Sequence, residues 1–149
     1  TLSSSSAASD VYKRQKEYFD TVGLEFPEAL VKQLIDDASI FTRTLKVHYN
    51  RPRPYQVADH PLVNIKIGEE AKMESMNTPS YPSGHSTQGI LIGRVLSDMF
   101  PKHKFNLMNI GLDISKSRNV GRAHYKSDSK FGMKLGHEMF DYLKKMNRI

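Results

Sequence analysis

Three short stretches of the sequence contain histidine at the end or the start of an expected helix. Two of them also contain lysine and arginine. They are KVHYNRPRP (46–54), YPSGHST (81–87) and SRNVGRAHYKSD (117–128). The N-terminus of a helix carries free N–H groups and a partial positive charge, so it binds anions such as phosphate. Histidine adds a group that exchanges a proton near neutral pH. These residue types predict chemistry on an anionic group.

The middle stretch opens a helix with histidine instead of the acidic residue that the positive end of a helix favours. Ser83 is suited to cap this helix, and Gly84 lets a ligand approach the backbone closely. His85, in the first turn, is placed to donate a proton to a leaving oxygen. The alternative for this stretch is a capped turn with an incidental surface histidine.

The other two stretches offer a histidine–carboxylate pair and two cations. A spacing of four places Asp128 one helical turn from His124, within hydrogen-bond reach. A carboxylate on one ring nitrogen fixes the tautomer and leaves the other nitrogen free to attack. Lys46 lies at the end of its expected helix, and Arg53 lies in a proline-bracketed turn. The alternatives are a surface ion pair and a basic surface corner.

In order and spacing, these residues resemble the tripartite signature of the type 2 phosphatidic acid phosphatase superfamily. The elements here are K-x6-RP (46–54), PSGH (82–85) and S-R-x5-H-x3-D (117–128). The matching positions are Lys46, Arg53, Ser83, Gly84, His85, Ser117, Arg118, His124 and Asp128. Three ordered elements are far rarer by chance than any one of them. The resemblance implies a bundle of helices with the site at one end.

The resemblance also implies a role for each matched residue. His124 attacks phosphorus in line and becomes a phosphohistidine, while Asp128 holds and polarises its ring. His85 protonates the leaving alkoxide and then activates water. The phosphate oxygens are bound by Lys46, Arg53, Ser83, Gly84 and Arg118, which stabilise charge in the transition state. The resemblance implies no metal and no cofactor, and vanadate is expected to inhibit as a phosphate mimic.

Two positions depart from the family pattern. Arg51 with Pro52 offers a second, shorter spacing, so Arg53 is chosen on the family spacing and Arg51 is the lesser candidate. Many members have glycine two residues before the nucleophilic histidine, whereas here Gly121 lies three residues before it and Ala123 is adjacent. Because a small residue is still present, we expect an intact site with a different pocket shape.

Apolar residues at helical spacing predict the elements that position these side chains. We expect helices from about Pro27 to Lys46, ending near Asn50, from Gly84 to Phe100, from Lys104 to Val120 and from Lys126 onward, with one short helix within 60–73. Strand signals are nearly absent. The predicted fold is an all-α helical bundle.

Residues 1–15, TLSSSSAASDVYKRQ, form a separate low-complexity stretch. Their composition is typical of a linker and resembles translated adaptor sequence, so we interpret them as a non-native leader. Residues 16–149 are interpreted as a single helical phosphatase domain, because this length buries one core. Since no secretory signal or membrane span is visible, we expect a soluble chain whose compartment and oligomeric state stay open.

The formal charge of +6 favours an anionic partner. With no cysteine, disulfides and thiolate chemistry are excluded. The expected function is hydrolysis of phosphate monoesters on a small phosphorylated substrate, similar to the soluble class A bacterial acid phosphatases. No nucleic acid partner is expected.

Five alternatives compete with this function. A pseudoenzyme is less favoured because the set of matched residues is complete. A vanadium-dependent haloperoxidase would hold vanadate as a cofactor in the same site. A basic helical nucleic-acid-binding module fits the charge but lacks a recognisable binding motif. A catalytic serine triad is less favoured, because YPSGH is not a nucleophile elbow. A metal site of histidine and aspartate is also less favoured, because too few ligands are evident.

Overall fold

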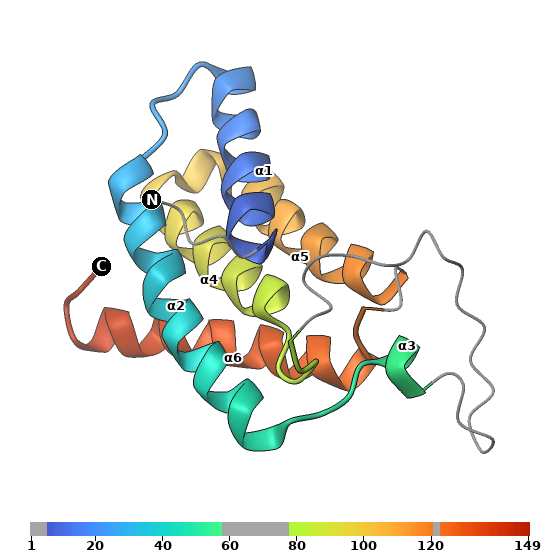
Figure 1. Cartoon of the computed structure of the whole chain (residues 1–149). Coiled ribbons are helices and arrows are strands. Elements are labelled where there is room, and N and C mark those ends of the chain that lie inside the picture. The colour runs from blue at the N-terminus through green and yellow to red at the C-terminus, as the bar shows by residue number, and fades with distance from the viewer. Residues whose placement is uncertain (1–5, 58–77, 121–122) are drawn as a thin grey trace.

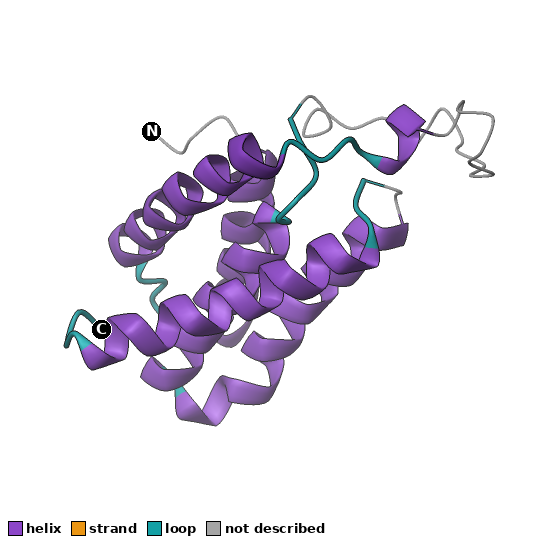
Figure 2. Ribbon diagram, turned by 90° about the horizontal axis from the view of Figure 1, so that it is seen from below, coloured by secondary structure: helices purple, strands orange, loops and turns teal. Residues whose placement is uncertain are grey.

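The computed structural model describes residues 6–57, 78–120 and 123–149, and within these ranges it contains helices and loops without strands (Figure 1). The helices are α1 Ser6–Val22, α2 Glu28–Tyr49, α3 Pro54–Val57, α4 Gly84–Met99, α5 Lys104–Val120 and α6 Lys126–Lys145, with a 3-10 turn at Pro101–His103. Figure 2 shows the same helices joined by loops. The predicted all-α bundle is confirmed for the described residues.

The ends of α2 and α4 follow from the residues found there. After α2, Asn50 takes the left-handed conformation (φ 46°, ψ 42°), and its N–H donates to the Lys46 carbonyl. The next residues precede prolines and avoid the helical region, so the chain leaves the helix. Before α4, the Ser83 side chain accepts a hydrogen bond from the Ser86 N–H at 3.2 Å. These boundaries, and the starts of α5 and α6, agree closely with the prediction.

Helix α4 is the central element, packed against α1, α2, α5 and α6. Figure 1 shows it lying between them. Consecutive residues Ile90, Leu91 and Ile92 are all buried, so apolar side chains cover most of its circumference instead of one stripe. Burying one such side chain stabilises the fold by about 1.5–3 kcal/mol. The start of α4 therefore belongs to the most firmly packed helix.

Glycine lets α6 approach α4 closely. A Cβ atom at Gly132 would lie 2.6 Å from the Ser83 carbonyl oxygen, and one at Gly136 would lie 2.6 Å from the Thr87 carbonyl oxygen. Real Cβ contacts are longer than this, so only glycine fits without a shift of the backbone. Because α6 touches α4 at Ser83, this packing fixes the start of α6 relative to the cap of α4.

The structure differs from the expected linker at residues 6–15, which form the first part of α1. Val11 and Phe19 are buried in the core, and Gln15 between them is buried too. Residues spaced by four lie on one face of a helix, so these three form the contact face. The sequence signal for this helix is weak, because one polar residue interrupts its apolar face and a serine-rich run precedes it.

The short helix expected within 60–73 lies outside the described residues. The structure adds α3 at Pro54–Val57, where no helix is expected from the sequence. Among the described helices, none is both long enough and apolar enough to cross a bilayer.

Candidate active site

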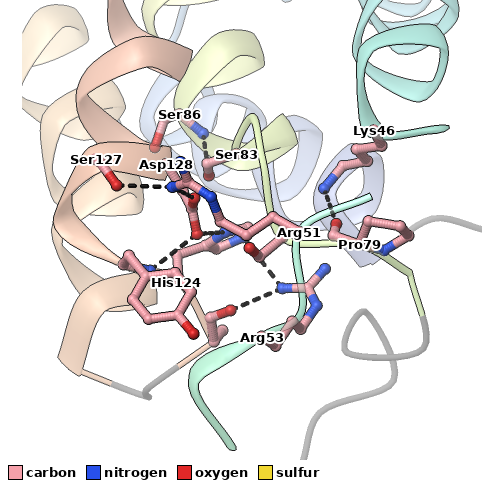
Figure 3. A network of polar contacts seen from close by, with 12 residues as sticks. Lys46, Arg51, Arg53, Pro79, Ser83, Ser86, His124, Ser127 and Asp128 are labelled. Atoms are coloured by element: carbon pink, nitrogen blue, oxygen red, sulfur yellow. Dashed lines mark hydrogen bonds and ion pairs between the residues drawn. The ribbon is translucent and has the colours of Figure 1, made fainter. Parts of the chain in front are cut away.

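Backbone hydrogen bonds join the segment after α2, the segment before α4 and the first turn of α6. The Ser80 N–H donates to the Arg51 carbonyl at 2.9 Å, and the Ser83 N–H donates to the Asp128 carbonyl at 3.1 Å. Figure 3 shows side chains from these segments directed toward one another. The three sequence stretches therefore meet at one end of the helices.

The predicted contact between His124 and Asp128 is confirmed. His124 Nδ1 lies 3.3 Å from Asp128 Oδ2, and the Tyr125 backbone N–H donates to the same oxygen at 2.9 Å. As the expected helix start near Lys126 implies, His124 precedes α6 and Asp128 lies in its first turn. Tyr125 is the N-cap of α6, and Asp128 is the third residue of the helix, so its side chain turns back to the Tyr125 N–H. This hydrogen bond holds the Asp128 carboxylate beside the residue that follows His124.

Burial keeps the His124 ring neutral. It lowers the pKa of His124 from 6.5 to about 4; the hydrogen bond to Asp128 opposes this, and the charges of Arg53 and Lys46 add to it. Burial alone would raise the pKa of Asp128, but hydrogen bonds from His124 and the Tyr125 N–H outweigh it and lower that pKa. A carboxylate only accepts hydrogen bonds, so Nδ1 carries the proton and Nε2 keeps its lone pair.

Arg53 places a buried guanidinium beside that lone pair. Its Nη1 lies 3.3 Å from His124 Nε2 and donates to the Ala123 carbonyl at 2.9 Å. Its Nε donates to the Thr78 carbonyl at 2.7 Å, and Nη2 donates to Thr78 Oγ1 at 3.2 Å. Arg53 is 1% exposed, and these anchors fix its plane. A fixed guanidinium matches the oxygens of a phosphate group in a bidentate way.

Arg51, the lesser candidate, contacts a different member of the pair. Its Nη1 donates to Asp128 Oδ1 at 2.7 Å and to Ser127 Oγ at 2.7 Å (Figure 3). Its guanidinium also lies over the Tyr81 ring, 4.3 Å from the centroid. The family spacing favours Arg53 in the motif, but it does not say what Arg51 contacts. The structure separates them by their partners.

Ser83 and Gly84 form the start of α4, as predicted. Ser83 is buried and acts as the cap, and Thr87 Oγ1 donates back to the Ser83 carbonyl at 2.9 Å. Gly84 is half-buried as the first residue of the helix. The first N–H groups of a helix lack partners within it, which is the property that binds anions.

His85 is buried, so the alternative of an incidental surface histidine is wrong. Its exposed fraction is 3%, and its Nε2 lies 3.6 Å from Asp10 Oδ2 in α1. The sequence does not predict this contact, because nothing in the low-complexity stretch 1–15 indicates a helix packed on α4.

The remaining matched residues are Lys46, Ser117 and Arg118. Lys46, in the last turn of α2, donates from Nζ to the Pro79 carbonyl at 2.6 Å. Ser117 Oγ donates to a carbonyl of its own helix at 2.8 Å. The backbone of Arg118 belongs to α5, but its side chain, like Gly121, lies outside the described residues. Over the described ranges, no three histidine, aspartate or glutamate side chains gather as metal ligands do.

Residues 34–140 match the model of the PAP2 superfamily. The chain is 30% identical over 127 residues to an acid phosphatase of Zymomonas mobilis subsp. mobilis, which covers 78% of this chain and 46% of that protein. It is 32% identical over 99 residues to a non-specific acid phosphatase of Salmonella typhimurium. That match covers 64% of this chain and 36% of the relative. The chain is 31% identical over 100 residues to a non-specific acid phosphatase of Providencia stuartii. That match covers 66% of this chain and 39% of the relative.

The chain spans less than half the length of these curated relatives. The range matched by the family model, by contrast, takes in most of this chain. That range contains all three segments that meet at the site. The chain therefore belongs to the PAP2 superfamily.

Proposed function

We propose that this chain hydrolyses phosphate monoesters through a phosphohistidine on His124, without a metal ion. One observation carries the proposal: His124 has Nδ1 on the Asp128 carboxylate and Nε2 at 3.3 Å from the buried Arg53 guanidinium. A nucleophile, an orienting carboxylate and an oxyanion-binding cation thus converge on one ring. The relatives named as acid phosphatases support this function over the haloperoxidase and nucleic-acid alternatives.

In the first half of the reaction, the Nε2 lone pair attacks phosphorus opposite the ester oxygen. A P–N bond forms, the P–O bond to the alcohol breaks, and Asp128 stabilises the positive charge on the ring. Arg53, Lys46 and Arg118, with the start of α4, bind the three non-bridging oxygens. His85 donates its proton to the leaving alkoxide, which departs as the alcohol.

In the second half, water takes the place of the alcohol. His85 accepts a proton from this water as its oxygen attacks phosphorus. A P–O bond forms, the P–N bond breaks, and His124 recovers its lone pair. Inorganic phosphate leaves, and His85 is protonated again for the next cycle.

The test compares phosphate release from an aryl phosphate and an alkyl phosphate in the presence of a chelator. We expect both to be hydrolysed, vanadate to inhibit, and His124→Ala to lower both rates by about 10³-fold or more. His85→Ala should slow the alkyl ester by about 10²–10⁴-fold and the aryl ester far less, because a good leaving group needs no proton.

Lys134→Ala is the control, because this side chain is exposed on α6 and should leave both rates unchanged. Full activity of His124→Ala would contradict the phosphohistidine. Equal losses for the two esters in His85→Ala would contradict its role as the acid. Halide oxidation by peroxide after vanadate loading would instead indicate the haloperoxidase function. Salt-sensitive nucleic-acid binding without phosphate release would indicate the binding module.

A further inference from the structure

Two arginines reach the site from one short segment after α2. Arg51 and Arg53 each precede a proline, which favours the extended backbone. In extended backbone, residues two apart point to the same side, so both side chains face the site. The hydrogen bond from the Ser80 N–H to the Arg51 carbonyl, 2.9 Å, holds this segment beside the start of α4.

The two guanidinium groups contact different atoms of the histidine–aspartate pair. Arg53 Nη1 lies 3.3 Å from His124 Nε2, whereas Arg51 Nη1 donates to Asp128 Oδ1 at 2.7 Å. The other carboxylate oxygen, Oδ2, contacts His124 Nδ1 at 3.3 Å and accepts from the Tyr125 N–H at 2.9 Å. Both oxygens are therefore held, and the carboxylate is restrained from rotating away from the ring.

Aromatic side chains hold Arg51 in place. Its guanidinium lies 4.3 Å from the Tyr81 ring centroid and 5.8 Å from that of Tyr125. Tyr81 itself stacks on Phe131 at 4.9 Å and meets Tyr49 edge-on at 4.9 Å. Stacking on an aromatic face restricts both the position and the plane of a guanidinium. Arg51 is thus anchored although its side chain is 36% exposed.

We propose that Arg51 is a positioning residue, which locks the Asp128 carboxylate so that the His124 ring stays aimed at phosphorus. This inference rests on the proposed function of the site. In-line attack needs a fixed direction of the nucleophile, and small misplacements of reacting groups are costly. Loss of Arg51 should therefore impair the chemical step while phosphate binding, which depends on Arg53, stays nearly intact.

Arg51→Gln removes the charge, and its amide N–H group lies two bonds short of the position from which Arg51 Nη1 donates to Asp128. We expect kcat to fall by about tenfold or more and the inhibition constant for inorganic phosphate to change by less than about threefold. The acid limb of kcat/KM should move to higher pH, because removing a cation beside the pair makes its ring easier to protonate. Arg53 and Lys46, whose charges lower the pKa of His124, stay in place.

Arg51→Lys keeps the charge but not the planar fork. It should restore the acid limb to its original pH and recover only part of kcat. This variant also carries the test if Arg51→Gln fails to fold: a lowered kcat with unchanged phosphate inhibition supports positioning, and an unchanged kcat overturns it.

Two control variants separate positioning from other roles. Arg53→Gln should raise the phosphate inhibition constant strongly, because Arg53 is the proposed phosphate ligand. Arg94→Gln is the matched control: Arg94 also pairs with a carboxylate, Asp141 at 3.1 Å, and lies over a ring, Phe140 at 4.0 Å. Arg94 lies further along α4, so its loss should leave kcat and the pH profile unchanged.

Unchanged kcat in Arg51→Gln overturns the proposal. A rise in the phosphate inhibition constant as large as that of Arg53→Gln also overturns it, because Arg51 would then be a phosphate ligand. Wild-type protein without phosphate release contradicts the proposed function. In protein that does release phosphate, a wild-type kcat of Arg51→Gln contradicts the role of Arg51 alone.

Discussion

At the scale of single residues, the site depends on a histidine that stays unprotonated. Burial lowers the pKa of His124 to about 4, because a charged ring would lose its contact with water. The hydrogen bond to Asp128 favours the charged ring, while the cations Arg53 and Lys46 disfavour it. The imidazole therefore keeps its Nε2 lone pair, the proposed nucleophile, well below the pH at which an exposed histidine is half protonated.

We expect kcat/KM to hold as the pH is lowered and to fall only near pH 4, the pKa of His124. Protonation of Nε2 would block the proposed attack on phosphorus. Because the pKa of His124 is lowered, the loss of kcat/KM should occur at a lower pH. The unfolded chain binds this proton more tightly, so the free energy of unfolding should also decrease as the pH falls from 6.5 toward 4. A pH–rate profile at constant ionic strength measures the first effect, and an NMR midpoint near 6.5 for His124 would contradict both.

The contact between His124 and Asp128 could be predicted from their spacing of four residues, although nothing in the sequence marks Tyr125 as the N-cap between them. The different partners of Arg51 and Arg53 could not, because two Arg-Pro units give the same local signal. Burial of His85 could not be predicted either, since it depends on packing against a segment distant in sequence.

At the scale of elements, helix ends could be predicted where local chemistry decides them. Prolines after Asn50 and the hydroxyl of Ser83 act within one or two residues of the ends that they mark. Helix α1 could not be predicted, because its contact face has Gln15 between Val11 and Phe19. Its helical state depends on packing against α4 more than on its own pattern.

The close contact between α4 and α6 predicts the effect of Gly132→Ala. The new Cβ would lie 2.6 Å from the Ser83 carbonyl oxygen and 3.0 Å from Ser86 Cβ, so the backbone must shift. We expect the free energy of unfolding to decrease by about 1–3 kcal/mol. We also expect kcat to fall, because the shift strains the hydrogen bond between Ser83 and Asp128. Urea unfolding and steady-state kinetics measure the two effects.

Helix propensity acts against this destabilisation, because alanine favours a helix over glycine by about 0.8–1.0 kcal/mol. A net decrease in stability therefore reports the clash. Lys134→Ala on the same helix, where the side chain is 69% exposed, is the control and should change stability by less than about 0.5 kcal/mol. Wild-type stability and kcat in Gly132→Ala would show that α6 moves freely relative to the cap of α4.

At the scale of the whole molecule, positive charge is in excess. The chain has 22 lysines and arginines against 16 acidic residues, a formal charge of +6. Lys46, Arg51 and Arg53 gather three of these cations around His124 and Asp128. A phosphate monoester is an anion, so this field should raise its local concentration and its rate of encounter. Dissolved salt weakens the attraction, with a screening length of about 10 Å at about 0.1 M.

We therefore expect kcat/KM for an anionic phosphate ester to fall as sodium chloride rises from about 0.02 M to about 0.5 M, while kcat changes little. Salt screens the approach of the substrate, whereas the buried guanidinium of Arg53 acts where screening is weak. Steady-state kinetics at fixed pH measure both parameters, and thermal unfolding at each salt concentration checks that the fold is unchanged. A kcat/KM independent of salt would show that the net charge does not attract the substrate. A fall in kcat at constant KM would place the effect of salt on the chemical step.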